Sequence, residues 1–143
     1  MKINIKNRIV VFFIILITLY SCAKKEPDVV GVYINKFDTY KHGALHYLVV
    51  NKDSTYNHIY ILENDTMYIK DKWFIYLSNH WNIVFDNWES MGCEKKNNFF
   101  SGENIWRSFM ISYGCLIIGE DYPDLSFYRI DSAEIKRLGI VIR

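Results

Sequence analysis

The feature that most constrains this fold is a succession of short apolar runs separated by turn-forming residues. In the run Thr55–Leu62, Ile59 and Ile61 share one face, opposite His58 and two tyrosines. A period of two places alternate side chains on opposite faces of a strand, and it does not suit a helix. The pattern therefore predicts β-structure, and Lys52-Asp53-Ser54 before this run predicts a hairpin turn.

Similar runs continue along the chain, and Gly114 is the expected bend in the longest of them. The stretch Trp88–Gly102 is rich in Lys, Asn and Gly and is predicted to be an exposed loop. The expected strands cover residues 30–35, 45–51, 55–62, 66–70, 73–78, 81–86, 105–118 and 125–130.

The tail carries the one helix that the sequence predicts. Asp131-Ser132-Ala133-Glu134 resembles a capping box, and Gly139 can close a helix of about two turns. Many short antiparallel strands in about 120 residues favour a meander that forms a small barrel or half-barrel. The predicted fold class is therefore all-β with a short C-terminal helix.

The first 21 residues read as a signal peptide. Three cations precede an apolar run, Ile9–Leu19, of eleven residues. A membrane-spanning helix needs about 20 apolar residues, so this run is short for a permanent anchor. The alternatives are an uncleaved anchor and an ordinary secretory leader. We expect residues 22–29 to be a tether and residues 30–143 to form a single domain.

The residues Leu19-Tyr20-Ser21-Cys22 resemble the lipobox of bacterial lipoproteins, although Tyr20 stands where a small residue is usual. The resemblance implies cleavage before Cys22 and acylation of its sulfur. It also implies attachment to a membrane of the cell envelope, with Ala23 favouring the outer membrane. Residues 23–29 reach at most roughly 25 Å, which would hold the domain close to the bilayer.

The composition after the leader disfavours nucleic acid as a partner. The chain has 17 Lys and Arg, three of them in the leader, so 14 face 16 Asp and Glu, a formal net charge of −2. No basic stripe appears. The catalytic and cofactor motifs for acyl transfer, phosphate binding and dinucleotide binding are also absent from the sequence. We therefore expect a protein without catalysis, cofactor or metal.

Two segments resemble small lipocalin-like lipoproteins of the Bacteroidota. These are Gly31-Val32-Tyr33 and the hairpin Leu48–Tyr56, in which Ser54 stands where that group usually has Gly. The resemblance implies a meandering barrel or half-barrel, and it implies no particular ligand.

Cys93 and Cys115 are the thiols that remain once Cys22 is acylated. An oxidising compartment favours a disulfide between them, and the alternative is two free thiols. His42 and His46 are four residues apart, but the surrounding turn and strand pattern argues against a zinc helix. Scattered surface or half-buried histidines are the expected arrangement.

The aromatic residues suggest the binding site. Trp73 and Tyr76 lie in a run that is apolar on both faces, and Trp81 opens the next. One face can be core, while the other must be covered by the tail, a partner or a ligand. The leading hypothesis is a small apolar ligand held at Trp73, Tyr76 and Trp81. The alternative is a protein-interaction module, such as an inhibitor or immunity lipoprotein, and a well-filled core remains the simpler interpretation.

Overall fold

The computed structural model describes residues 25–92, 106–117 and 126–140. Eight strands and two short helices lie in these ranges. The strands are β1 (Gly31–Asn35), β2 (Leu45–Val50), β3 (Thr55–Leu62), β4 (Asp65–Leu77), β5 (Trp81–Phe85), β6 (Arg107–Ser112), β7 (Cys115–Ile117) and β8 (Phe127–Ile130). The helices are α2 (Lys36–Lys41) and α4 (Ser132–Arg137).

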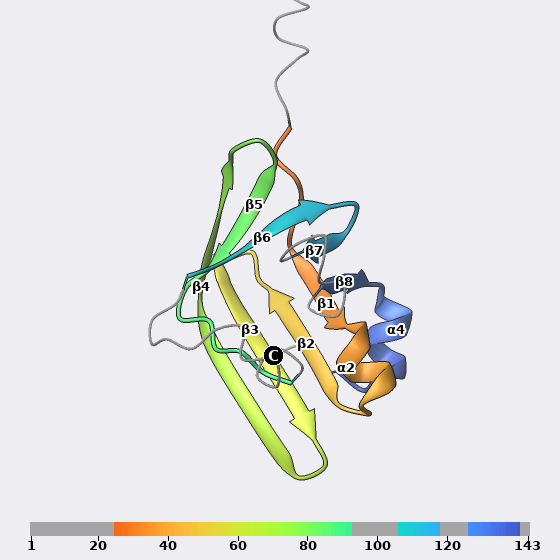
Figure 1. Ribbon diagram of the computed structural model, residues 1–143. Coiled ribbons are helices and arrows are strands. Elements are labelled where there is room, and N and C mark those ends of the chain that lie inside the picture. Colours follow the sequence, from red (N-terminus) through yellow and green to blue (C-terminus); the bar gives the residue numbers. More distant parts are fainter. Residues whose placement is uncertain (1–24, 93–105, 118–125, 141–143) are drawn as a thin grey trace, which may run out of the picture.

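The strands form a closed antiparallel barrel in sequence order (Figure 1). Each strand pairs with the next, and β1 closes the ring by pairing with β8, with Val32 opposite Ile130. Closure leaves little unpaired edge among the described strands, the exception being residues 65–72 of β4, which pair with β3 on one side. The structure confirms the all-β prediction and selects the closed barrel over the half-barrel.

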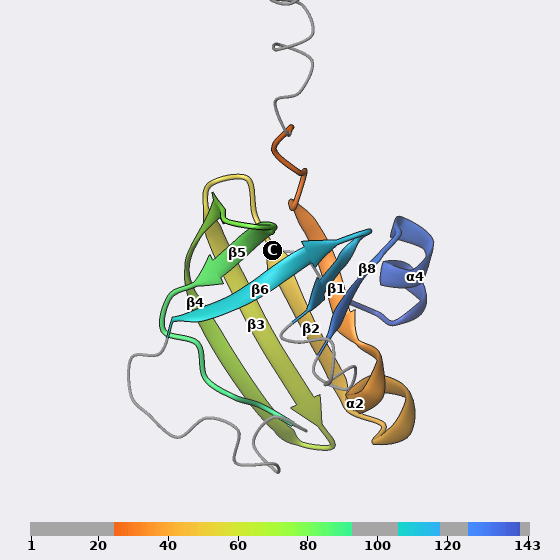
Figure 2. The same cartoon turned by 45° about the horizontal axis from the view of Figure 1, so that its top comes forward.

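The two ends of the barrel differ. Residues 25–30 enter β1 at the end that also carries the turns after β2, β4 and β6, as Figure 2 shows from a second side. Arg129 fastens this entry by donating to the carbonyl oxygens of Asp28 and Val30. Val29 is already buried against the core, so the folded domain begins before β1. Helix α2 lies at the opposite end.

Side chains fill the barrel interior. Aromatic rings dominate it and pack edge to face, with Phe85 and Phe109 centroids 5.5 Å apart. The buried interior cluster is Val29, Tyr33, Leu48, Val50, Tyr56, Ile83, Phe85, Trp88, Phe109, Leu116 and Phe127. The described interior is therefore a packed core.

Helix α4 packs on the outside of the barrel beside β1 and β8 (Figure 2). Asp131 caps it as the sequence predicts, because its side chain accepts from the Glu134 backbone N–H at 2.8 Å. Ile135 and Leu138 cover the outward residues of β1 and β2. Gly139 follows in the left-handed region, with φ of 67°.

The structure corrects the prediction of two strands at 66–70 and 73–78, because β4 is one strand of 13 residues. Its first part pairs with β3 and its second part with β5. Lys70-Asp71-Lys72 lie where the two predicted strands were separated. These residues instead alternate between faces of the strand, and no Gly or Pro interrupts them.

Helix α2 corrects the prediction that the tail holds the only helix. The Asn35 side chain caps it by accepting from the Asp38 backbone N–H at 2.9 Å. Asn35, the acid at Asp38 and Gly43 after the helix are the start and stop signals that could have revealed it.

The beginning of the 88–102 segment was expected to be exposed, and that part of the prediction is wrong. Trp88 is 3% exposed and Met91 is fully buried. The described residues 88–92 thus turn into the barrel end that α2 borders. The expected bend at Gly114 is confirmed, since Tyr113 and Gly114 both have positive φ and join β6 to β7 in a tight turn.

Candidate functional site

A chain of three buried polar side chains lies at the α2 end of the barrel interior. Asp38 on α2 contacts His46 on β2, with Oδ2 and Nδ1 2.6 Å apart. His46 in turn contacts His58 on β3, with the two Nε2 atoms 2.8 Å apart. All three residues are at most 1% exposed. Three polar groups are rarely buried together unless they bond one another.

The hydrogen bonds define the tautomers of this chain when Asp38 is a carboxylate and both rings are neutral. The carboxylate accepts from Nδ1–H of His46, which leaves Nε2 of His46 as an acceptor. His58 must then donate its Nε2–H to His46. The remaining nitrogen, Nδ1 of His58, is a bare acceptor and has no partner among the described residues.

Aromatic rings enclose the two histidines. The Trp88 indole stacks on His58 with centroids 4.0 Å apart and an angle of 19° between the planes. Phe127 packs edge-on against both imidazoles, and Tyr60 packs edge-on against His46. Burial holds the pKa of His58 well below its usual value. Burial also lowers the pKa of His46, against the opposing effect of the Asp38 carboxylate.

This arrangement can hold and relay a proton. An Asp–His pair orients a ring and can support a nucleophile. Here the second ring, His58, takes the place where a nucleophile would stand. Its Nδ1 touches no hydroxyl or thiol in the described part of the chain. The same described ranges contain no group of three His, Cys, Asp or Glu side chains placed to hold a metal ion.

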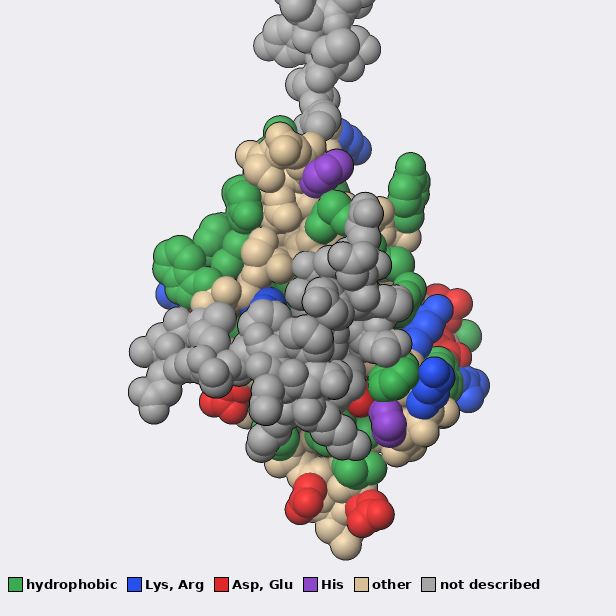
Figure 3. All heavy atoms as spheres, viewed as in Figure 1, with side chains coloured by type: hydrophobic (Ala, Val, Ile, Leu, Met, Phe, Trp, Pro, Cys, Tyr) green, Lys and Arg blue, Asp and Glu red, His purple; other side chains and the backbone are tan. Residues whose placement is uncertain are grey.

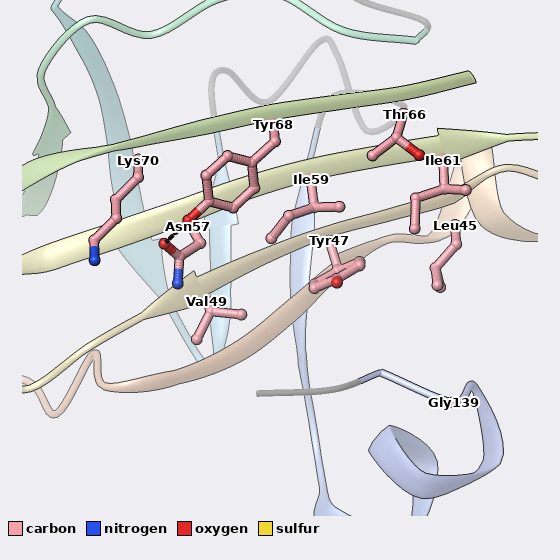
Figure 4. Close-up of a pocket in the computed structure, with 10 residues that line it drawn as sticks. All are labelled: Leu45, Tyr47, Val49, Asn57, Ile59, Ile61, Thr66, Tyr68, Lys70 and Gly139. Carbon is pink, nitrogen blue, oxygen red and sulfur yellow. Dashed lines mark hydrogen bonds between the residues drawn. The ribbon is translucent and has the colours of Figure 1, made fainter. Parts of the chain in front are cut away.

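A groove on the outside of the barrel is a separate candidate site (Figure 4). Its volume is about 560 Å³, within the usual range for small-ligand pockets. Outward side chains of β2 and β3 form its apolar floor, β4 contributes its polar rim, and the turn after α4 bounds it. The lining residues are Leu45, Tyr47, Val49, Asn57, Ile59, Ile61, Thr66, Tyr68, Lys70 and Gly139.

The rim of the groove is more accessible than its floor. Tyr47, Val49 and Ile59 are each at most 7% exposed, whereas Tyr68 is 57% exposed. The Tyr68 hydroxyl donates to the Asn57 side-chain oxygen at 2.9 Å, which holds the ring against β3. Among the described residues of the lining, Lys70 supplies the one charged side chain.

The structure separates the three residues predicted to bind a ligand. Trp73 packs against the interior cluster, and its indole N–H donates to the Asn51 carbonyl at 3.1 Å. Trp81 is the first residue of β5 and pairs with Leu77, and Tyr76 lies on the outer face of β4. None of the three lines the groove, so their role in ligand binding stays a prediction.

The predicted cysteine sites fall mostly outside the described residues. Cys22 and Cys93 both lie outside them, so lipidation and the disulfide remain predictions. Cys115 is partly buried on β7, and burial raises the pKa of its thiol. Among the described residues, no helix has the length and apolar character that crossing a bilayer requires.

The buried histidine pair is what sequence reasoning missed. His46 and His58 were expected to be scattered, and the Tyr56 face of β3 was a candidate exterior. The structure places that face in the core. His46 lies opposite Tyr60 and His58 lies opposite Leu48 in the β2–β3 ladder, so the two histidines are diagonal neighbours whose side chains meet. A signal was present, because each histidine alternates with the outward aliphatic residues of its strand.

No family model, curated protein or solved structure matches this chain.

Proposed function

We propose that this protein is a membrane-anchored, non-catalytic lipoprotein of the cell envelope that binds a small amphipathic ligand on the outside of its barrel. The leader and Cys22 support the anchor and the location. The observation that carries the binding function is the outer groove, which joins an apolar floor to a single cation, Lys70.

The filled interior favours an external site over a cavity within the barrel. Phe85, Phe109 and Phe127 are fully buried on different strands and occupy the space in which a carrier barrel would hold a ligand. Binding at that place would require several buried aromatic rings to move, whereas the outer groove is already formed.

The lining of the groove points to the chemistry of the ligand. An apolar body would cover Ile61 and the ring of Tyr68, and an anionic or acceptor group would reach Lys70. Between Ile61 and Asn57, four residue steps on β3 span roughly 13 Å, because a strand rises about 3.3 Å per residue. A medium-length acyl chain with a terminal carboxylate has this size and polarity.

Binding of a fluorescent probe to the outer groove would test this function. We expect dansylaminoundecanoic acid to bind the full-length protein in detergent solution, with the dansyl emission shifted to the blue. Ile61→Glu places a charge in the groove and should weaken binding at least tenfold, which is about 1.4 kcal/mol. Leu62→Glu is the matched control, because the adjacent Leu62 is 37% exposed and outside the groove lining. Equal binding by both variants, or none by the wild type, would rule out the groove.

The anchor needs a separate test. We expect labelled palmitate to enter the wild-type chain expressed in a bacterial host that processes lipoproteins, and the protein to fractionate with membranes. Cys22→Ser should abolish both results, while Cys115→Ser should retain both. Palmitate labelling that persists in Cys22→Ser would contradict the lipoprotein assignment without affecting the groove.

A protein partner is the second candidate function, and an exposed aromatic patch favours it. The patch consists of Phe74, Tyr76 and Trp106, which are 42%, 42% and 70% exposed. Phe74 and Trp106 pack edge to face with centroids 6.1 Å apart. Figure 3 shows hydrophobic side chains gathered on the side of the molecule over β4. Exposed aromatic residues are typical of binding hot spots.

Crosslinking would distinguish this alternative. A photoreactive residue at Ser108, next to Tyr76 on the patch, should capture a defined envelope protein in living cells. Trp106→Ala should abolish that crosslink, and Tyr113→Ala, a fully exposed residue at the β6–β7 turn, should retain it. A crosslink unaffected by Trp106→Ala would exclude the patch.

A further inference from the structure

The segment 86–92 closes the barrel over the buried histidines, and Trp88 also packs against the rings of Phe85 and Phe109 in the core. Three of its contacts lie nearest the histidines. Trp88 stacks on His58, as described above. Gly92 lies against the Asp38 carboxylate, with no space for a side chain between them. At the start of the segment, the Tyr56 hydroxyl donates to the Asp86 carbonyl at 2.5 Å. Two of these contacts therefore involve members of the Asp38–His46–His58 chain.

We propose that the Asp38–His46–His58 chain controls, through its protonation state, whether the segment 86–92 closes the barrel, and we call this device a proton-operated latch. When His58 takes up a proton, the Trp88–Gly92 segment leaves the barrel end opposite the N-terminal entry. Displacement of this segment does not involve the ligand groove, which lies on the outer face of the barrel.

The tautomers of His46 and His58 determine which ring nitrogen takes up an added proton. The other three ring nitrogens already take part in hydrogen bonds, so the added proton goes to Nδ1 of His58. The product is an imidazolium whose new N–H donor has no acceptor among the described residues. The donor is surrounded by Trp88, Phe127 and the apolar neighbours of the core. Burying a charged ring whose N–H has no acceptor carries a large desolvation penalty.

Two effects stabilise the imidazolium in its buried position, and both are smaller than the penalty of removing it from water. Stacking of the cation on the Trp88 indole gives a modest cation–π stabilisation. Of the two imidazole rings, the Asp38 carboxylate contacts only that of His46. Transfer of the Nε2 proton from His58 to His46 would bring the charge beside Asp38, but the new Nδ1–H of His58 would still have no acceptor among the described residues. Exposure of His58 to water removes the desolvation penalty. Displacement of the Trp88–Gly92 segment is therefore favoured over keeping the charged ring buried.

The groups facing His58 from each neighbouring element provide no other anion. The described neighbours are Asp38 on α2, His46 on β2, Tyr56 and Tyr60 on β3, Ile69 on β4, Trp88, and Phe127 on β8. Arg107, buried at the start of β6, is a cation and cannot replace one. Burial lowers the pKa of His58, so uptake of the proton falls below about pH 6.5.

The segment 86–92 is the element most able to move. Every barrel strand has a ladder partner on each side along at least part of its length. Asp86 still donates its backbone N–H to the Lys72 carbonyl, but residues 87–92 have no regular backbone ladder, and Asn87 and Gly92 have positive φ of 48° and 55°. Irregular segments open at a lower free energy than paired strands. Opening at this place would wet His58 and leave the barrel intact.

The experiment measures how accessible Trp88 is as the pH changes. Full-length protein in detergent, with Trp73, Trp81 and Trp106 changed to Phe, would report on Trp88 alone. We expect its acrylamide quenching constant to rise at least threefold between pH 7.5 and 4.5. The rise should be reversible, have a midpoint below 6.5 and leave the far-UV circular dichroism unchanged. In the wild type, ¹⁹F NMR of incorporated 5-fluorotryptophan gives the same measurement without these substitutions.

The variants test the role of His58. His58→Gln keeps an N–H donor toward His46 but cannot take up a proton, so the rise should disappear. His80→Gln, at an exposed turn, should retain it. A flat wild-type profile, a rise that survives in His58→Gln, or loss of circular dichroism at the same pH would each overturn the latch. If His58→Gln does not fold, the His58 ring titration in wild-type protein must share the Trp88 midpoint, and a different midpoint overturns the proposal.

Discussion

Gly92 packs directly against the carboxylate of Asp38, although 54 positions separate them in the sequence. A Cβ at residue 92 would overlap the Asp38 carboxylate and would also lie 2.7 Å from the Tyr60 ring. This contact joins the β5–β6 connection to α2. The glycine is needed here for space as well as for its positive φ.

Replacing this glycine should therefore reduce the stability of the fold by more than backbone strain alone would. Gly92→Ala is expected to lower the free energy of unfolding by about 3 kcal/mol, combining about 1–2 kcal/mol for the left-handed backbone with overpacking. Gly43→Ala is the matched control, because Gly43 has φ of 68° but no atom within 4 Å of the added Cβ. Urea denaturation of both variants measures the difference. Equal losses would show that the Asp38 contact is unimportant.

The stability of the protein should depend on pH through its buried histidines. Burial lowers the pKa of His58 and of His46 in the folded state, while both are near 6.5 in the unfolded chain. The unfolded state then binds more protons below pH 6.5, so stability is fully present above that pH and is lost as the pH falls. Urea midpoints measured between pH 8 and 5 should decline below 6.5. The slope should be smaller in His58→Gln and unchanged in His80→Gln, and equal slopes in all three proteins would contradict this account.

The sequence predicted the strands well wherever one face is buried. Thr55–Leu62 was predicted with its observed limits, because period-two alternation leaves only one arrangement of faces. It did not reveal which face is inside. Tyr56 and His58 look polar, while Ile59 and Ile61 look like core. In the structure the aliphatic pair lies under α4 and the groove, and the aromatic pair fills the barrel.

The candidate site was beyond sequence reasoning for a related reason. Asp38, His46 and Trp88 come from a helix, a strand and a connection, and their contacts depend on closure of the barrel. A one-residue change in the β2–β3 register would separate His46 from His58. Helix α2 was missed because six residues give too little periodicity, although its cap at Asn35 could have been recognised.

Loss of the α4 cap should destabilise the packed tail. Asp131→Ala removes the side-chain acceptor for the Glu134 N–H and should cost about 1 kcal/mol. Asp131→Ser should restore most of this, because a hydroxyl oxygen can accept the same bond. Thermal unfolding followed by circular dichroism compares the variants. If serine destabilises as much as alanine, the cap is not the source of the effect.

The last prediction concerns the thiols. If Cys93 and Cys115 form the predicted disulfide, unfolded protein prepared without reductant should contain no free thiol beyond any at Cys22. Reduction should then release two thiols. The closed loop of about 20 residues would contribute roughly 3 kcal/mol, so Cys93→Ser should lower stability by about that amount only under oxidising conditions. Cys115 alone would react slowly in the native state, because burial raises the pKa of its thiol. Two reactive thiols in the unreduced, unfolded protein would show that the cysteines are unpaired, and slow native labelling of Cys115 would then reflect burial alone.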